Sequence, residues 1–385
     1  MQNKKMRIFI IAGEVSGDVL GARIMQEMQD AEFIGIGGEN MIAAGLKSLF
    51  PISDLSVMGI IEVLANAKTL TRRIRQTSEA IIKSKPDIVL TIDAPSFAKS
   101  VIKQVRKSLE GQRLIKNGLR FHHVVAPQVW AWRSGRAKEY AAIFDKLYAF
   151  FDFEVPYFTK YGLDTVAVGH PIADGLIGKY KNKNLTEEDK EKIITLVPGS
   201  RMSEVKRLMP LFHDVVNQLV ANGYRNYKFI IPTVETTEKY VKSCIKGWQV
   251  KPETVASSQR YEVYSKTYIA IVASGTVSAE LAMLHIPTIV VYKMNPVTLW
   301  IGHMLIKIKW VSLVNILLNR CVYHEYLGGA ATAENVLNEV QQLTIPSVRN
   351  KMIEELKHAD KLWYRKDGAP AKLIAESLRK ELKIK

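Results

Sequence analysis

The sequence predicts an α/β protein with two tandem Rossmann-like domains, each built on a parallel sheet. Three observations support this fold class: the length, an alternation of strand and helix patterns, and the return of that alternation in the second half. At 385 residues the chain is too long for one ordinary domain core. Hydrophobic residues make up 47% and charged residues 24%, which is typical of a soluble globular protein.

In the first half, short apolar runs alternate with amphipathic stretches. The expected strands are Arg7–Ala12, Glu32–Ile36, Ile88–Ile92, Phe121–Val125, Lys146–Phe150 and Thr165–Val168. The expected helices between them include Asp18–Gln29, Ala65–Lys83 and Gly135–Ala142. Strands that alternate with helices in this way indicate a parallel sheet, because each crossover helix returns the chain to the same end of the sheet.

After a lysine-rich stretch the same rhythm restarts. Strands are expected at Ile193–Val197, Tyr227–Ile231, Tyr268–Val272 and Thr288–Tyr292. We therefore predict an N-terminal domain at 1–170, a linker at 171–192, a second domain at 193–345 and C-terminal helices at 346–385. Parallel α/β sheets bind ligands beyond the carboxyl ends of their strands, so a central cleft between the two domains is expected.

Charge favours anionic partners. Lys and Arg outnumber Asp and Glu by 54 to 38, a formal net charge of +16. Residues 65–120 alone contain 13 basic and four acidic side chains. This basic stretch is either a solvated face or a surface for anionic lipid head groups.

Two features bear on the compartment. The two cysteines, Cys244 and Cys321, form no CxxC pair, so neither a disulfide framework nor a structural zinc site is implied, and a reducing compartment fits. The most apolar stretch, Val297–Leu318, contains two lysines and a histidine, and mid-bilayer charges cost roughly 2.5–3.5 kcal/mol each, so we do not expect it to cross a membrane.

The loop after the first expected strand is rich in glycine but does not fit a nucleotide-binding motif. The spacing of Gly13, Gly17 and Gly21 matches neither G-x-G-x-x-G nor a P-loop. The carboxylate of Glu14 would repel a pyrophosphate, and it suits a hydroxyl or amide donor better. The alternative is a tight turn in which Asp18 favours the dipole of the following helix.

Asp93 follows the expected strand Ile88–Ile92 and precedes Ala94-Pro95. At the carboxyl end of a parallel strand, a carboxylate can accept the proton of an attacking hydroxyl. The alternative is a cap for a helix that begins near Pro95.

Two segments of the second domain favour phosphate binding. Leu196–Arg201 leads from a strand into a turn, where Arg201 would offer a planar fork of donors to a diphosphate. Ser274-Gly275-Thr276 opens a helix whose N-terminus attracts anions, and Glu280 one turn later can accept hydrogen bonds from ribose hydroxyls. The alternative is a pair of structural turns with a buried glutamate.

The segment Ala126–Arg133 places Trp130 and Trp132 beside a strand end, as either a cleft wall or core packing. His122 and His123 are adjacent in a strand, point to opposite faces and cannot chelate one metal. No Asp-x-Asp motif occurs, and Asp152-Phe153-Glu154 is the nearest approach to one. We therefore expect chemistry without a metal.

Nine segments in order resemble the lipid-A-disaccharide synthase family. They are AGEVSGD (Ala12–Asp18), VMGIIEVL (Val57–Leu64), IDAP (Ile92–Pro95), APQVWAWR (Ala126–Arg133), VGHP (Val168–Pro171), LVPGSRMSEV (Leu196–Val205), ASGTVSAELAML (Ala273–Leu284), YKMNPVT (Tyr292–Thr298) and VSLVNILLNR (Val311–Arg320). They span nearly the whole chain. The chain differs from the usual family pattern at Ser96, Val314 and Gly328-Gly329.

The resemblance implies a GT-B fold and an inverting, metal-independent glycosyl transfer without a cofactor. The donor would be UDP-2,3-diacylglucosamine and the acceptor 2,3-diacylglucosamine 1-phosphate, and the products would be the β-1,6-linked lipid A disaccharide 1-phosphate and UDP. The family resemblance also implies a cytoplasmic location, peripheral on the anionic surface of the inner membrane. A homodimer is a further possibility.

The resemblance also assigns roles to residues. Asp93 becomes the candidate general base and Glu14 its helper. The donor-binding residues would be Ser200, Arg201, Ser274, Gly275, Thr276, Glu280 and Asn315. The acceptor-side residues would be Ser16, Gly17, Asp18, Trp130 and Trp132.

Two other functions are weighed against this one. A UDP-N-acetylglucosamine 2-epimerase would share the twin Rossmann-like architecture, but its water-soluble substrate would not explain the basic stretch. A nucleic-acid-binding protein would explain the charge, but no helix-turn-helix, RRM or zinc-finger spacing is found, so no nucleic-acid partner is expected.

Overall fold

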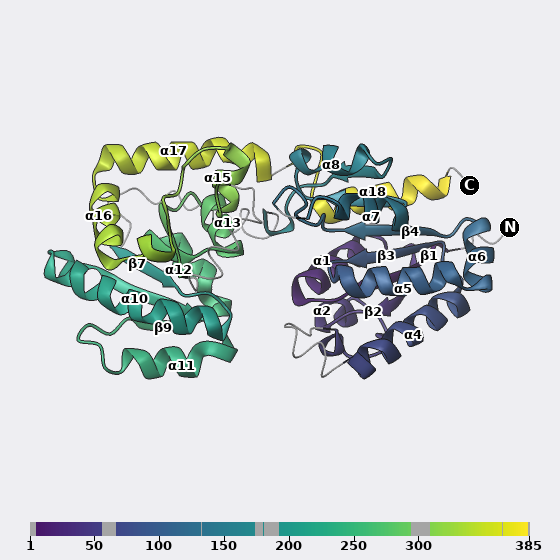
Figure 1. Ribbon diagram of the computed structural model, residues 1–385, viewed down its shortest axis with the longest axis horizontal. Coiled ribbons are helices and arrows are strands. Elements are labelled where there is room, and N and C mark those ends of the chain that lie inside the picture. The colour runs from purple at the N-terminus through teal and green to yellow at the C-terminus, as the bar shows by residue number, and fades with distance from the viewer. Residues whose placement is uncertain are drawn as a thin grey trace. The chain divides into compact units, whose positions relative to one another are not determined.

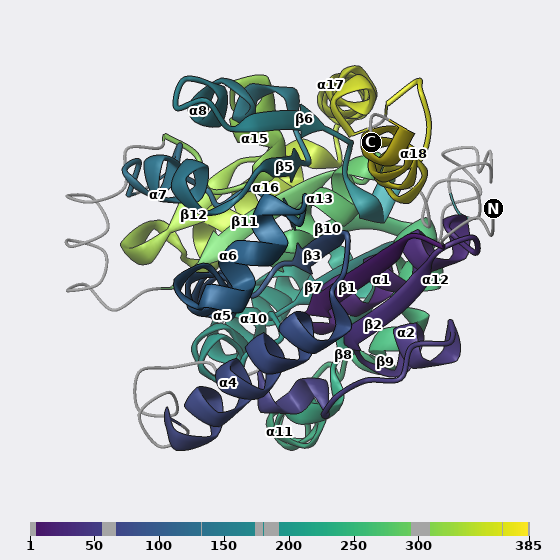
Figure 2. The same ribbon diagram turned by 90° about the vertical axis from the view of Figure 1, so that its right-hand side faces the viewer.

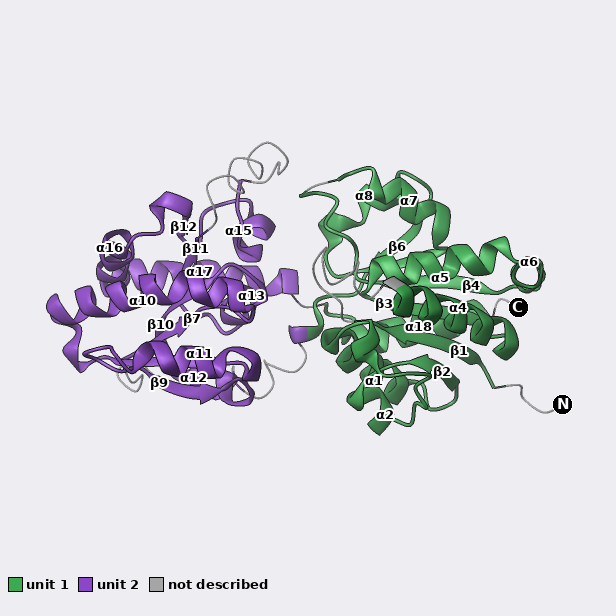
Figure 3. Cartoon of the chain, turned by 60° about the horizontal axis from the view of Figure 1, so that its bottom comes forward, with its two compact units in different colours: residues 1–171, 365–385 green, residues 172–364 purple. Residues whose placement is uncertain are grey.

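The computed structural model describes residues 5–55, 67–131, 133–173, 180, 192–293, 309–363 and 365–383. The segment Val57–Leu64, Trp132 and most of the expected linker lie outside these residues. The chain forms two compact units (Figure 3): unit 1 contains residues 1–171 and 365–385, and unit 2 contains residues 172–364. Each unit has a sheet of six parallel strands, which confirms the predicted fold class.

The sheet of unit 1 has the strand order β2-β1-β3-β4-β5-β6. Its strands are β1 (Arg7–Ala12), β2 (Glu32–Ile36), β3 (Ile88–Ile92), β4 (Arg120–Val124), β5 (Lys146–Ala149) and β6 (Asp164–Ala167). β1 lies between β2 and β3 (Figure 2), so the chain adds β2 on one side and then continues on the other. The chain therefore leaves β1 and β3 toward opposite faces of the sheet, where α1 and α5 lie. The place between these two strands is a topological switch point, the usual ligand site of such sheets.

Helices cover both faces of this sheet (Figure 1). They are α1 (Val15–Glu27), α2 (Glu39–Ala43), α4 (Ala67–Ser84), α5 (Pro95–Lys107), α6 (Leu109–Lys116), α7 (Arg136–Ile143), α8 (Pro156–Thr159) and α18 (Pro370–Lys383). Phe9 and Ile11 belong to the core beneath α4, α5, α7 and α8, whereas Ile8 and Ile10 belong to the core beneath α1 and α18. Successive residues of a strand point to opposite faces, so an unbroken apolar strand such as β1 fits a sheet that is covered twice.

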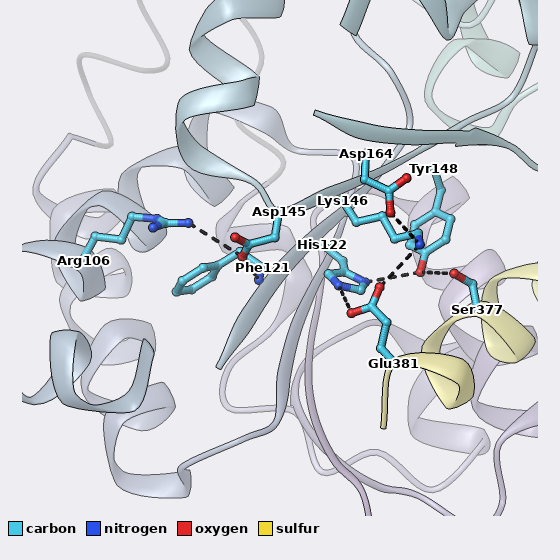
Figure 4. Close-up of polar contacts among 9 residues, drawn as sticks. All are labelled: Arg106, Phe121, His122, Asp145, Lys146, Tyr148, Asp164, Ser377 and Glu381. Atoms are coloured by element: carbon cyan, nitrogen blue, oxygen red, sulfur yellow. Dashed lines mark hydrogen bonds and ion pairs between the residues drawn. The ribbon is translucent and has the colours of Figure 1, made fainter. Parts of the chain in front are cut away.

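The C-terminal helix α18 returns to unit 1 and is held there by a polar network (Figure 4). The carboxylate of Glu381 lies 3.0 Å from Nε2 of His122 in β4 and 3.4 Å from Nζ of Lys146 in β5. The hydroxyl of Tyr148 donates to Ser377 Oγ at 3.1 Å. The helices expected together at 346–385 are thus divided, with the last one in unit 1.

The sheet of unit 2 has the order β12-β11-β10-β7-β8-β9. Its strands are β7 (Ile193–Val197), β8 (Lys228–Thr233), β9 (Glu253–Ala256), β10 (Thr267–Ala273), β11 (Thr288–Tyr292) and β12 (Glu325–Leu327). Its helices are α10 (Met202–Ala221), α11 (Glu235–Ile245), α12 (Arg260–Lys266), α13 (Thr276–Met283), α15 (Leu313–Leu318), α16 (Ala333–Leu343) and α17 (Pro346–Trp363). The switch point here lies between β7 and β10.

Two strands of unit 2 were not predicted. β9 and β12 are the outermost strands of the sheet and have four and three residues. Each contains only two apolar residues, which is too few for a recognisable strand pattern. No helix within the described ranges is long and apolar enough to span a bilayer.

Candidate active site

In unit 1 the loops after β1 and β3 are in direct contact. A Cβ atom added to Gly13 would lie 2.0 Å from Cβ of Ala94, so only glycine allows this approach. A Cβ atom added to Gly17, in the first turn of α1, would lie 3.2 Å from the carbonyl oxygen of Ile92, the last residue of β3, which is a tight contact. Glycines of the first loop thus bring the backbone next to Glu14 close to the backbone next to Asp93.

Unusual backbone conformations are concentrated at this edge of the sheet. Asp93, Ala94 and Val125 have φ angles of 57°, 46° and 83°, although none of them is glycine. A positive φ is rare for non-glycine residues and is a marked outlier for a β-branched side chain such as Val125. Conformations of this kind cost about 1–3 kcal/mol each and cluster at functional sites. The carboxyl ends of β3 and β4 are therefore held in a strained form by the surrounding fold.

Asp93 is a half-buried carboxylic acid at this edge. Burial raises the pKa of Asp93 above its ordinary value, and the hydrogen bond that Oδ1 accepts from the backbone N–H of Ala94, at 2.9 Å, partly offsets this. A raised pKa makes the carboxylate a better proton acceptor near neutral pH. The alternative was that Asp93 caps the helix that begins near Pro95. In the structure α5 begins at Pro95, its N-cap residue is Ala94, and no side chain caps it.

Asp18, which was expected on the acceptor side, is buried beside the N-terminus of α2. It is 2% exposed, and its carboxylate accepts hydrogen bonds from the backbone N–H groups of Gly38, Asn40 and Met41 and from the side chain of Asn40, at 2.7–3.0 Å. These donors lie at the N-terminus of α2. A carboxylate there satisfies orphan N–H groups and favours the helix dipole, so the structure gives Asp18 a scaffolding position. Ser16, two residues earlier, is exposed.

Trp130 lies in the loop after β4 and is tied to a buried acid that the sequence analysis set aside. Its indole N–H donates to Oε1 of Glu154 at 3.4 Å. Oε2 of Glu154 accepts from the backbone N–H groups of Phe150 and Phe151, both at 3.2 Å. Burial raises the pKa of Glu154 to about 7. Trp130 is therefore anchored by a carboxylic acid that titrates near neutral pH.

A cavity in unit 2 lies at the switch point between β7 and β10. It has a volume of about 280 Å³. Six of the seven residues expected to bind the donor line it: Ser200, Arg201, Ser274, Gly275, Thr276 and Glu280. The loop after β7 leads into α10 and the loop after β10 leads into α13, so two helix N-termini border the cavity. Helix N-termini stabilise anions through their free N–H groups and the helix dipole.

Arg201 is exposed and is paired within the loop. Its Nη1 lies 3.1 Å from Oε1 of Glu204, in the first turn of α10. Gly199 has a φ of 99°, and a Cβ atom there would lie 2.5 Å from Oε2 of Glu204. Gly199 therefore lets the loop turn tightly around Glu204. An exposed ion pair of this kind is weak, about 0–1 kcal/mol, so Arg201 can exchange Glu204 for a stronger anion at little cost.

Glu280 lies on α13 with only 8% of its surface exposed. Its carboxylate accepts hydrogen bonds from the hydroxyl of Tyr261 at 3.0 Å and from Nε of Arg260 at 3.4 Å. Burial raises the pKa of Glu280, while the charge of Arg260 and the bond from Tyr261 oppose that rise. Glu280 lines the same cavity as Arg201.

Asn315, the seventh expected donor residue, is not among the residues that line this cavity. It is fully buried, and its amide is used by the protein: Nδ2 donates to Tyr323 O and Glu325 Oε1, and Oδ1 accepts from the N–H groups of Val322 and Tyr323. Glu325 in turn accepts from the N–H groups of Val311 and Ser312. Asn315 thus ties α15 to the segment that follows it, and Glu325 of that segment holds the loop before α15. Ser274 of the cavity donates to the carbonyl oxygen of Val311 in the same loop at 3.4 Å.

The chain is similar to known proteins along nearly its whole length. Residues 8–374 match the family model described as Lipid-A-disaccharide synthetase. The chain is 35% identical to the lipid-A-disaccharide synthase of Rhodospirillum centenum, with 97% of this chain and 94% of the relative covered. The enzyme of the same name from Rickettsia typhi is 36% identical, with 97% and 99% covered. The chain belongs to the lipid-A-disaccharide synthase family.

Solved structures resemble this member of the lipid-A-disaccharide synthase family in fold. The UDP-GlcNAc 2-epimerase of Neisseria meningitidis bound to UDP-GlcNAc has a TM-score of 0.65 at 13% identity, with 97% of this chain and 100% of that chain covered. S. aureus MnaA with UDP has a TM-score of 0.63 at 14% identity, with 99% and 98% covered. These neighbours support the two-domain Rossmann-like GT-B fold, and the sequence relatives decide the family.

Three polar residues beside the candidate sites were not picked out from the sequence. Arg260 and Tyr261 contact Glu280, and Glu154 contacts Trp130. Arg260-Tyr261 opens the short helix α12 and has no motif around it, and Glu154 looks like one acid in an aromatic run. No signal short of the folded contacts marks them. In the described part of the chain, no three His, Cys, Asp or Glu side chains are grouped to hold a metal ion.

Proposed function

We propose that this chain transfers a 2,3-diacylglucosamine unit from UDP to 2,3-diacylglucosamine 1-phosphate, forming the β-1,6-linked lipid A disaccharide 1-phosphate and UDP. The observation that carries the proposal is the match to lipid-A-disaccharide synthases along the whole chain. Two features of the geometry support it: an acid of raised pKa at the switch point of unit 1, and a cavity lined by Arg201 and bordered by two helix N-termini at the switch point of unit 2.

In the proposed reaction, the acceptor's 6-hydroxyl oxygen attacks C1 of the donor sugar from the face opposite UDP. The new C–O bond forms as the bond from C1 to the diphosphate oxygen breaks, so the configuration at C1 inverts. The hydroxyl proton passes to the Asp93 carboxylate, which is a general base, and Glu14 orients the acceptor from the adjoining loop. Ser16, Gly17 and Trp130 are proposed to face the acceptor.

Unit 2 is proposed to bind the nucleotide and stabilise the leaving group. Arg201 and the N–H groups that begin α13, at Ser274–Thr276, would share the negative charge of the departing diphosphate. Ser200 would add a hydroxyl donor at the same loop. Glu280 would accept hydrogen bonds from the ribose hydroxyls. These groups supply the electrostatic stabilisation that a metal gives in other transferases, so we propose chemistry without a metal.

We further propose that the protein works at an anionic membrane surface, since both sugars carry acyl chains. Lys68, Thr71, Arg72 and Arg75 line a shallow groove on α4, in the basic part of the chain. Basic side chains near an anionic surface contribute about 1 kcal/mol each. A cytoplasmic location and a homodimer remain part of this proposal.

The deciding experiment supplies both acylated sugars and measures disaccharide by mass spectrometry and UDP release by a coupled assay, with and without EDTA. Equal amounts of disaccharide and UDP, unchanged by EDTA, are expected. Absence of disaccharide would refute the transfer, and loss of activity with EDTA would refute metal independence. A parallel incubation with UDP-N-acetylglucosamine alone tests the epimerase alternative. An epimerase would convert this sugar nucleotide to its C2 epimer.

A further inference from the structure

Glu280 and Arg260, which line the cavity of unit 2, form a closed polar network with Tyr261. The hydroxyl of Tyr261 donates to Oε1 of Glu280 at 3.0 Å, and Nε of Arg260 donates to Oε2 at 3.4 Å. Nη2 of Arg260 donates to the hydroxyl of Tyr261 at 2.6 Å, and Nη1 donates to the carbonyl oxygen of Ser257 at 2.9 Å. All three nitrogens of the guanidinium therefore bind protein oxygens.

This network fixes the direction of the carboxylate. Each oxygen of Glu280 has one protein donor, and the guanidinium of Arg260 lies 4.0 Å above the ring of Tyr261, which restricts both side chains. An ionised carboxylate has about four acceptor sites. Two of them are used by Tyr261 and Arg260, which leaves about one on each oxygen. Two acceptor sites side by side match the two hydroxyls of a cis-diol.

The network also solves an electrostatic problem. A bare carboxylate in a cavity lined by Arg201 and bordered by two helix N-termini would repel the phosphates that those groups attract. The fixed charge of Arg260, whose side chain is only 31% exposed, offsets the charge of Glu280. Arg260 lines the same cavity, and each of its three guanidinium nitrogens donates to a protein oxygen.

We propose that Arg260 and Tyr261 are positioning residues that hold the Glu280 carboxylate toward the cavity to receive both ribose hydroxyls of a nucleoside diphosphate. The inference rests on the proposed function, because it concerns the same nucleotide site. It assigns the choice of ribonucleotide over deoxyribonucleotide to a pair of residues on α12.

The test compares binding of UDP and 2′-deoxy-UDP to the full-length protein by calorimetry. The wild-type protein should bind UDP at least tenfold more tightly, because 2′-deoxy-UDP leaves one acceptor of Glu280 without a partner. Arg260→Gln should weaken UDP binding, and it should reduce the ratio of the affinity for UDP to the affinity for 2′-deoxy-UDP to less than threefold. Arg260→Lys, which restores the charge but not the fork of donors, should recover part of that ratio.

Two controls separate positioning from general damage. Lys266→Gln, at the exposed end of the same helix, should leave both affinities and their ratio unchanged. Arg201→Gln should weaken both ligands by the same factor, because it acts on the phosphates. Tyr261→Phe removes only one hydroxyl, so it serves as the test of positioning if Arg260→Gln does not fold. The ratio of the UDP affinity to the 2′-deoxy-UDP affinity should fall in this variant too.

An unchanged ratio in Arg260→Gln, with UDP and 2′-deoxy-UDP weakened equally, would overturn the inference while leaving the nucleotide site in place. An unchanged ratio in folded Tyr261→Phe would overturn the part assigned to Tyr261. Failure of the wild-type protein to bind UDP at all would instead overturn the proposed function, and the inference with it.

Discussion

Asp93 combines a strained backbone with a half-buried carboxylate, and both properties come from the end of β3. Its N–H still donates to Val124 O in the neighbouring strand at 3.2 Å, although its φ is 57°. The strand therefore continues its hydrogen bonding while the chain turns. Aspartate tolerates this conformation better than most residues, and so does asparagine.

Asp93→Asn should therefore fold normally and lose most of its turnover. If Asp93 is the general base, kcat should fall by about 10²–10⁴-fold. In the wild-type protein the rate should rise with pH as the carboxyl loses its proton, at a pH above that of an ordinary aspartate because its pKa is raised, and this limb should vanish in the variant. Disaccharide formation between pH 4 and pH 9 measures both effects. UDP affinity serves as the control, and near-normal turnover would leave Asp93 a helix-start residue only.

Glu154 presents a second buried acid, and its burial predicts a specific pH dependence of stability. Its pKa is about 7 in the folded protein against 4.5 for an ordinary glutamate. Between these values the folded state holds a proton that the unfolded state has lost. The stabilisation is thus complete below about pH 4.5 and is lost as pH rises through 7, on the order of 3 kcal/mol in total.

Glu154→Gln cannot titrate, so the gap in unfolding free energy between wild-type and variant should change by about 2.5 kcal/mol, most of that total, between pH 5 and pH 8, in favour of the variant at pH 8. Urea unfolding at both pH values measures it. His170, whose pKa is lowered to about 4 by burial, contributes equally to both proteins and cancels. A gap that stays constant with pH would show that Glu154 ionises normally.

Individual residues illustrate what chemistry in a sequence can and cannot predict. Arg201 and Glu280 were recognised as donor-site candidates because loops that follow parallel strands converge, and both line the cavity. Asp18 and Asn315 looked equally suitable, but backbone N–H groups already donate to their side-chain oxygens. Those donors come from 20 and 23 residues away for Asp18 and from 7 and 8 residues away for Asn315. The same residue type is a ligand or a scaffold depending on which donors the fold brings to it.

Among the elements, α18 has the least foreseeable position. Its apolar face, Ile374, Ala375 and Leu378, is fully buried against the sheet of unit 1, although the preceding helix α17 belongs to unit 2. An amphipathic pattern predicts that a helix packs, but not on which sheet. Short edge strands such as β12 were missed for a related reason: pairing with β11, not their own sequence, makes them strands.

Glu381→Gln should weaken the attachment of α18. Burial raises the pKa of Glu381, but the hydrogen bond from His122 and the charge of Lys146 outweigh it, so its pKa lies below the ordinary value. The stabilisation is present above the unfolded pKa and is lost as pH falls through the folded one. The variant should lose roughly 1–2 kcal/mol at pH 7, and the difference should shrink below about pH 4.

Thermal or urea unfolding at pH 7 and pH 3.5 provides the measurement. Lys380→Gln changes a neighbouring, exposed residue of the same helix and should have little effect. Equal stability of wild-type and Glu381→Gln at pH 7 would mean that the contacts of Glu381 with His122 and Lys146 do not hold the helix.

At the scale of the whole molecule, the net charge of +16 predicts salt-sensitive attraction to anionic surfaces. Reversal of Lys68 and Arg72 to glutamate, in the groove on α4, should weaken binding to vesicles that contain anionic phospholipid by at least tenfold in 0.1 M salt. Co-sedimentation with vesicles measures this.

A matched pair of charge reversals elsewhere provides the control. Lys239→Glu with Lys351→Glu changes the net charge of the chain equally, at exposed positions of unit 2. Equal losses in the two double variants would attribute binding to overall charge and not to α4.

The sequence by itself determined the fold class, the approximate position of ten of the strands and the family. These properties depend on local sequence, namely the period of the apolar residues and the short motifs that follow each strand. Only the tertiary structure decided which polar side chains are available. It assigned Asp18 and Asn315 to the scaffold, joined Arg260 and Tyr261 to Glu280, placed α18 on unit 1 and strained the backbone at Asp93 and Val125. The physical reason is that hydrogen-bond satisfaction and burial depend on which partners the fold brings together, and the apolar period of a segment does not specify them.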